Sequence, residues 1–206
     1  MEYEIATGRA SLYTHLRIAA RRATSSRLPL LLGLFGAGFV AQRVSQGVLD
    51  GLYARSGYPV PYYAGQLSFS GRKLSGWYSA MERGGTLETY WQTQFVDFAF
   101  IAATALFFTA ALLLVARAMP PASAARSKAV ALVPLALVAP VADALENLIS
   151  FVLLSDPAHV NGALAIVYST VAAVKFAGFA FVYLWLPAGL LTAALLRFRG
   201  RCLATS

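Results

Sequence analysis

The sequence is poor in the residues that build metal, redox and nucleophilic sites. It has one cysteine, Cys202, and two histidines, His15 and His159. A single cysteine excludes an intrachain disulfide, a CxxC redox pair and a thiolate metal cluster. The motifs HExxH and GxSxG and the Walker phosphate loop are also missing. We therefore expect no metal site and no cofactor, and we exclude thiol-based oxidoreductases.

Charged residues are scarce as well. They make up 13% of the 206 residues, whereas hydrophobic residues make up 58%; a soluble domain carries about 25% charged residues. The mean hydropathy is +0.62, and the apolar residues fall in long blocks. The net charge of +8 does not indicate nucleic-acid binding, because the basic residues stand at the ends of these blocks. The composition is that of an integral membrane protein.

Four apolar blocks predict an all-α protein, an integral membrane four-helix bundle. A helix of about 20 residues crosses the roughly 30 Å hydrocarbon core of a bilayer. The last block is longer than a simple span and contains Pro187, which predicts a tilted or kinked helix, or a start above the bilayer. The predicted transmembrane domain is 28–197, with spans at 28–50, 94–116, 129–154 and 165–196.

The distribution of Lys and Arg predicts the orientation. Basic residues gather in the N-terminal segment 1–27, in the connection after the second block, and in the tail 198–206, whereas the connection 155–161 has none. By the positive-inside rule, both termini are cytoplasmic and the long loop 51–93 is outside. We predict a bacterial cytoplasmic (inner) membrane, which is the plasma membrane of such cells. Within the cytoplasmic segment 1–27, the stretch from Ala10 to Arg22 is expected to form a short amphipathic helix on the inner leaflet; alternatively, the segment is a disordered basic tail.

The outer loop 51–93 is too long to serve only as a connection. Within it, the segment Ser70 to Arg83 predicts a short helix, whose apolar face follows the spacing i, i+3, i+4, i+7. That face consists of Leu74, Trp77, Tyr78 and Met81. The helix would lie on the bilayer as an interfacial helix or cover a polar cavity as a lid. Tyr90–Trp91 would anchor the next span at the level of the headgroups.

Ionisable residues interrupt the apolar blocks. Each costs about 2.5–3.5 kcal/mol near the centre of a spanning helix, so such residues usually face a bundle interior and pair with one another. Counted from the nearest predicted cytoplasmic basic residue, they lie 15 to 22 residues into their spans. They are Arg43, Asp97, Asp143, Glu146 and Lys175. Because all lie at a similar depth, in the outer third of the bilayer, we predict that they converge on a polar pocket.

Helical spacing extends this set on two of the spans. Arg43, Gln46, Gly47 and Asp50 share one face of the first, and Asp143, Glu146, Asn147 and Ser150 share one face of the third. Pro140 would leave the carbonyl of Ala136 without its helical donor. We select three acids as candidates for acid–base catalysis: Asp97, Glu146 and Asp143. Candidate ligand-binding residues are Arg43, Gln46, Asn147, Tyr168, Lys175 and Trp77.

Three short motifs carry a resemblance to a known group. They are Gly85 to Tyr90 (G-x4-Y), Asp97–Phe98, and Pro140 to Leu148 (PVADALENL). With this combination the chain resembles a widespread group of small four-helix membrane proteins that has no assigned activity. The resemblance covers about residues 66–157. It implies a shared bundle and a shared acidic site, with an Asp in the second helix and DxxEN in the third, and it implies no particular reaction.

Several functions fit these patterns. The pocket would bind a membrane lipid or isoprenoid, or carry out acid–base chemistry on it; whether the protein is an enzyme stays open. Alternatively, it is an accessory subunit that docks a partner membrane protein or a second copy of the chain. A small proton-coupled transporter is disfavoured because no internal repeat is present. In a purely architectural alternative, Arg43 and an acid fix helix register, Asn147 bonds across helices, and Lys175 snorkels to the interface.

Overall fold

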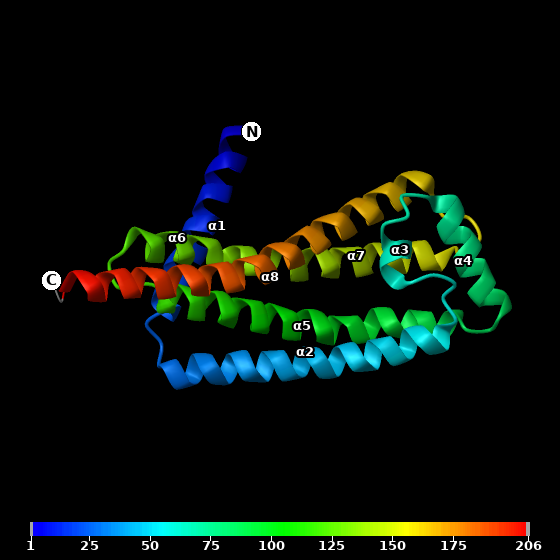
Figure 1. Ribbon diagram of the computed structural model, residues 1–206. Helices are drawn as coiled ribbons and strands as arrows, with labels where there is room; N and C mark the ends of the chain where they lie inside the picture. Colours follow the sequence, from blue (N-terminus) through cyan, green and yellow to red (C-terminus); the bar gives the residue numbers. More distant parts are fainter. Residues whose placement is uncertain (1, 205–206) are drawn as a thin grey trace. The chain divides into compact units, whose positions relative to one another are not determined.

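In the part that its structure, a computed structural model, describes, the protein consists of helices joined by turns and short connections (Figure 1). The backbone is described for residues 2–204, and side chains for residues 12–200 and Cys202. The remaining side chains of the predicted segments 1–27 and 198–206 lie outside the described residues. No strand occurs within 2–204. The predicted all-α class is confirmed.

Four stretches are long and apolar enough to cross a membrane. They are Leu28–Ser56 (α2), Leu87–Ala118 (α5), Ala124–Ser155 and Gly162–Gly200, the last within α8, Gly162–Ala204. This confirms four candidate membrane-spanning helices, while their orientation stays a prediction. Helix α2 continues six residues beyond its predicted end, and α5 begins seven residues before its predicted start. Hydropathy marks only the apolar part of a helix, whereas the helical backbone hydrogen bonds continue into the polar residues beyond it.

The third spanning stretch changes its helical type along its length. It consists of α6 (Ala124–Leu132), a 3₁₀ segment η1 (Val133–Leu137) and α7 (Val138–Ser155). Pro134 and Pro140 lack the N–H group that an α-helical hydrogen bond requires, and the tighter 3₁₀ turn accommodates this loss. The 3₁₀ segment includes Ala136, the residue at which the sequence predicts an interruption.

The chain divides into two compact units. Unit 1 comprises Met1–Ala37, Leu106–Leu137 and Phe179–Ser206, and unit 2 comprises Gly38–Ala105 and Val138–Gly178. The three basic segments that predict the cytoplasmic side all fall in unit 1. The loops 51–93 and 155–161, which are predicted to be outside, both fall in unit 2.

In unit 1, the N-terminal segment is a helix, α1 (Glu2–Ala23), that packs against α6 and η1. The Tyr13 hydroxyl donates to the Ala131 carbonyl at 3.0 Å. Arg117 donates to the carbonyls of Thr24 and Ser26, at 2.9 and 2.6 Å, and so satisfies backbone groups where α1 ends. Of the two alternatives for this segment, the helix forms; its contact with a lipid leaflet stays a prediction.

In unit 2, the outer loop contains α3 (Tyr62–Gln66) and α4 (Gly71–Arg83), and α4 begins at an N-cap, Ser70. Leu74, Tyr78 and Met81 are at most 2% exposed and pack into one core with residues of α5, α7 and α8. The Ser75 hydroxyl accepts from the backbone N–H of Val160 at 2.9 Å, which ties α4 to the α7–α8 connection. The apolar face of the predicted helix therefore packs against protein.

Two sequence interpretations of packing are corrected here. Tyr90, read as an anchor in the headgroup region, is buried at 2% exposure. The first span also carries a stripe of small residues, Gly33, Ala37 and Ala41, whose spacing predicts close helix packing. All three are exposed, and a Cβ added at Gly33 would meet nothing within 4 Å. The close helix contact lies instead between α8 and α7, where a Cβ at Gly178 would be 2.9 Å from the nitrogen of Ala139.

Candidate functional site: a buried acid–lysine cluster

A lysine on α8 joins two acids on α7 inside unit 2. Lys175 Nζ lies 3.1 Å from Asp143 Oδ1 and also forms an ion pair with Glu146 Oε2. Asp143 and Glu146 are three positions apart and therefore share one face of the helix. Lys175 is 4% exposed, Asp143 3% and Glu146 0%. The three charged groups are thus removed from solvent. In the protein interior, electrostatic interactions are stronger than in water.

A third acid, Asp97 on α5, belongs to the same cluster. Asn147 Nδ2 donates to Asp97 Oδ2 at 2.8 Å and lies 3.5 Å from the Gln94 carbonyl. Asn147 follows Glu146 directly, so a single turn of α7 carries both the acids that pair with Lys175 and the amide that donates to Asp97. Asp97 also interacts electrostatically with Asp143 and Lys175. At 9% exposure it is the most accessible of the three acids.

The cluster has more carboxyl groups than cations. Asp97, Asp143 and Glu146 face one ammonium group, that of Lys175, and the ion pairs between described residues give these acids no other cation. A buried carboxylate without a counter-charge is strongly disfavoured, so it takes up a proton or binds a cation. Within the described part of the chain, no group of three His, Cys, Asp or Glu residues is placed to hold a metal ion. The arrangement therefore suits proton exchange with a bound polar group.

Tyrosine side chains surround the cluster on the side of the outer loop. Tyr168 on α8 is 1% exposed and interacts with Glu146. The rings of Tyr58 and Tyr90 stack with centroids 4.9 Å apart, and those of Tyr78 and Tyr90 are 5.7 Å apart. We call Tyr53, Tyr58, Tyr78 and Tyr90 the tyrosine layer. Burial raises the pKa of Tyr58 and of Tyr78 well above the ordinary value, so both hydroxyls stay protonated even at an alkaline pH that ionises an exposed tyrosine.

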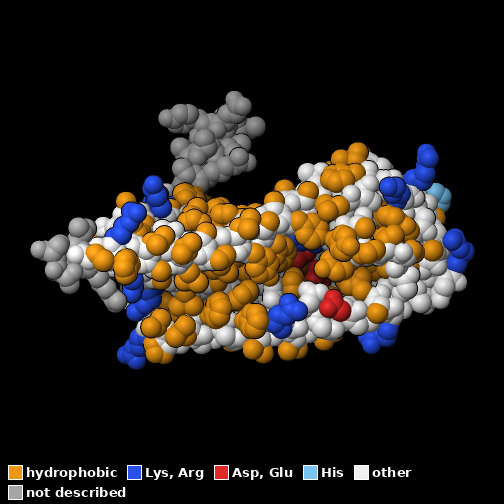
Figure 2. Space-filling view, viewed as in Figure 1, with side chains coloured by type: hydrophobic (Ala, Val, Ile, Leu, Met, Phe, Trp, Pro, Cys, Tyr) orange, Lys and Arg blue, Asp and Glu red, His pale blue; other side chains and the backbone are white. Residues whose placement is uncertain are grey.

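One face of the molecule has a recess (Figure 2). Figure 2 shows acidic side chains set back in a recess among apolar side chains, on the face that this view presents. A cavity enclosed by the protein around the acids stays a prediction. A pocket of defined volume lies elsewhere, in unit 1.

Six of the nine predicted site residues come together in this cluster. Lys175 points inward to two acids and does not snorkel. Helical period and equal depth predicted the convergence of Asp97, Asp143, Glu146 and Lys175, but the same reasoning also included Arg43, which the structure leaves outside. The six are Asp97, Asp143, Glu146, Asn147, Tyr168 and Lys175.

The structure does not bring Arg43, Gln46 and Trp77 into the ion pairs and hydrogen bonds of this cluster. Helix α2 buries Gln42 and Leu49, which are seven positions apart, and so turns Arg43 outward. Gln46 donates to Asp50 on its own helix at 2.7 Å. Trp77 packs edge-on against Tyr58, at 5.9 Å between ring centroids.

Sequence reasoning missed two groups of residues. Gln94 precedes Asp97 by three positions and lies on the same helix face, so its spacing was a usable signal. The Gln94 amide donates to the hydroxyl of Thr93 at 2.9 Å. The tyrosine layer joins residues of α2, the loop, α4 and α5, which are far apart in the sequence. Aromatic residues in a membrane loop are commonly interfacial, so no local pattern distinguishes a layer that packs within the protein.

Comparison with known proteins gives no relative. No protein-family model, no curated protein and no solved structure matches this chain. What can be said of the site therefore comes from the geometry of its own residues.

Proposed function

We propose that unit 2 binds the polar group of a membrane lipid or isoprenoid at the acid–lysine cluster and exchanges protons with it. The observation that carries this proposal is the surplus of buried carboxyl groups over cations. Such a surplus is costly for a purely structural element, because a buried charge without a partner destabilises the folded protein. The resemblance to the four-helix group with an Asp and a DxxEN motif would then reflect a common acidic site.

The residues take three roles in this proposal: proton exchange, orientation and stabilisation of charge. Asp97 is the group that exchanges a proton with the ligand, since it is the most accessible acid, and Asn147 orients it by donating to one oxygen. Lys175 is held by Asp143 and Glu146 and stabilises negative charge that develops on the ligand. Glu146, beside the Tyr168 hydroxyl, is the second acid–base group.

The proposed setting is the bacterial inner membrane, with both termini in the cytoplasm. Supporting it, the basic segments all fall in unit 1, and the loops with few basic residues fall in unit 2. The acid–lysine cluster would then open toward the outer leaflet.

Replacing one acid tests this function. A strain that lacks the protein is complemented with wild type, Asp97→Asn or Asp50→Asn, and its lipids are profiled by mass spectrometry. Asp50 is an exposed acid on α2 and serves as the matched control. We expect the deletion to change the level of a lipid or isoprenoid, wild type and Asp50→Asn to restore it, and Asp97→Asn to fail although it is made at normal level. Full restoration by Asp97→Asn would refute the proton-exchange role.

A second candidate function, docking of a partner membrane protein, is favoured by one observation on α2. Arg43 is exposed in a candidate spanning helix, next to exposed Val40 and Val44. No described acid forms an ion pair with Arg43, and an unpaired charge facing lipid costs about 2.5–3.5 kcal/mol. A partner helix that covers this face would remove the cost.

Cross-linking in native membranes tests the docking function. Recovery of the monomer alone excludes docking, whereas a complex that the Arg43→Leu substitution disperses supports it.

A further inference from the structure

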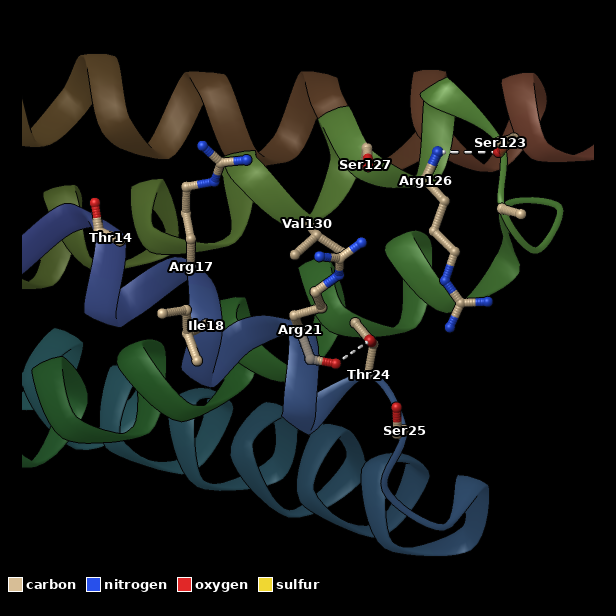
Figure 3. Close-up of a pocket in the computed structure, with 11 residues that line it drawn as sticks. Thr14, Arg17, Ile18, Arg21, Thr24, Ser25, Ser123, Arg126, Ser127 and Val130 are labelled. Atoms are coloured by element: carbon tan, nitrogen blue, oxygen red, sulfur yellow. Dashed lines mark hydrogen bonds between the residues drawn. The ribbon is translucent and has the colours of Figure 1, made fainter.

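A pocket of about 650 Å³ in unit 1 is lined by several basic side chains. Its walls come from α1, from the link between α1 and α2, and from the start of α6 with the residues before it (Figure 3). The lining includes three arginines, Arg17, Arg21 and Arg126, and its described residues include no acid. The volume lies in the range of small-molecule sites, about 300–1,000 Å³. The pocket is separate from the acid–lysine cluster, whose residues all belong to unit 2.

The three arginines reach the pocket from two elements. Figure 3 shows Arg21 extending from α1 toward α6, and Arg126 extending from α6 toward the link between α1 and α2. No ion pair with a described acid neutralises them. Arg17 and Arg21 are exposed and Arg126 is half-buried, and together they give the lining a net positive charge that attracts an anion. Their planar, forked donors match the oxygens of a phosphate group.

Hydroxyl groups and the start of α6 add further polar recognition. The lining includes five residues that carry a hydroxyl, Thr14, Thr24, Ser25, Ser123 and Ser127. The Thr24 hydroxyl donates to the Arg21 carbonyl and the Ser123 hydroxyl to the Pro120 carbonyl. The Ser123 hydroxyl caps α6 by accepting from the N–H of Arg126 at 3.1 Å. Helix α6 therefore begins at the pocket, and the partial positive charge of a helix N-terminus favours an anion there. Ile18 and Val130 provide an apolar part of the wall.

We propose that this pocket binds a phosphate-bearing ligand, with Arg17, Arg21 and Arg126 holding the phosphate and Ile18 and Val130 contacting its apolar part. The ligand's source is either the headgroup of an anionic lipid or a soluble phosphate compound. Both present the same group to the arginines. This site is additional to the acid–lysine cluster and does not depend on the function proposed for it.

Binding is measured with the full chain in nanodiscs of neutral phosphatidylcholine. The two probes are inorganic phosphate and a short-chain phosphatidic acid, which represent the soluble and the lipid source. The pocket variant is Arg17→Gln/Arg21→Gln/Arg126→Gln. The control variant, Arg22→Gln/Arg27→Gln/Lys128→Gln, removes the same charge from exposed positions of the same region that do not line the pocket.

We expect wild type and control to bind and the pocket variant to lose binding. The single variant Arg126→Gln should lower the affinity about tenfold, the effect of losing a charged hydrogen bond. The affinity of Arg126→Lys should lie between those of wild type and Arg126→Gln. Because the single variants keep two arginines, they test the site even if the triple variant does not fold. Binding of both probes indicates a soluble phosphate compound, and binding of phosphatidic acid alone indicates a lipid headgroup. No binding by wild type, or an equal loss in the control, would overturn the proposal.

Discussion

Lys175 is the residue on which the buried charges of unit 2 depend. It contacts both Asp143 and Glu146 at less than 5% exposure. A buried ion pair adds little net stability, because desolvation offsets the attraction between the charges. Removing one partner is different, since it leaves the other charge buried and alone. The lysine is therefore more important for stability than a count of its contacts suggests.

At the residue scale, we predict that Lys175→Met destabilises the protein by about 3–5 kcal/mol, the usual effect of breaking a buried pair. Thermal unfolding in detergent measures it as a fall in Tm. The control is Lys128→Met on α6, an exposed lysine, whose effect should stay within about 0.5 kcal/mol. The combination Lys175→Met/Asp143→Asn/Glu146→Gln should recover most of the loss. A Lys175→Met protein as stable as wild type would contradict the ion pairs.

Most individual site residues could be predicted because the helix period assigns faces. Asp143 and Glu146 must lie on one side of α7 in any structure in which that segment is helical. Arg43 shows where this reasoning stops. The period groups it with Gln46 and Asp50, but it does not determine whether that face is buried. Gln42 and Leu49 compete for the interior and occupy it.

At the element scale, α4 is held by a close approach to the α7–α8 connection. A Cβ added at Gly71 would lie 2.6 Å from the carbonyl oxygen of Val160, whereas one added at Gly76 on the same helix would meet nothing within 4 Å. We predict that Gly71→Ala destabilises the protein by about 1–3 kcal/mol through overpacking. Gly76→Ala should stabilise it by about 0.5–1 kcal/mol through helix propensity.

Chemical denaturation of the full chain and limited proteolysis of the outer loop measure the two glycine variants. Gly71→Ala should speed cleavage next to α4, because the helix must shift away from Val160. Equal stability of the two variants would show that α4 does not pack on the α7–α8 connection.

The helix α4 itself could be predicted from its apolar spacing, but its packing partner could not. Leu74, Tyr78 and Met81 make a face that would suit a bilayer surface as well as a protein core. The choice is decided by hydrogen bonds between residues far apart in the sequence. Besides Ser75 and Val160, the N–H of Phe69 donates to the Ser169 hydroxyl at 3.0 Å.

At the scale of the whole molecule, the predicted orientation can be tested with the single cysteine. Cys202 is exposed near the C-terminus, and the orientation places it in the cytoplasm. We predict that a membrane-impermeant maleimide does not label wild type in intact spheroplasts and labels it after permeabilisation. A Cys202→Ser/Ala158→Cys variant, with its cysteine at an exposed site of the α7–α8 connection, should be labelled without permeabilisation. Labelling of Cys202 in intact spheroplasts would reverse the orientation.

By itself, the sequence determined the class of the protein, its four apolar helices and the faces that carry its buried charges. These properties depend on composition and on the 3.6-residue period, which are local. Tertiary structure alone decided which faces meet. It turned Arg43 outward, packed the tyrosine layer together from four separate parts of the chain, and placed three arginines in the lining of the pocket of unit 1. Such choices depend on competition between distant segments for burial and for hydrogen-bond partners, and no local pattern contains that competition.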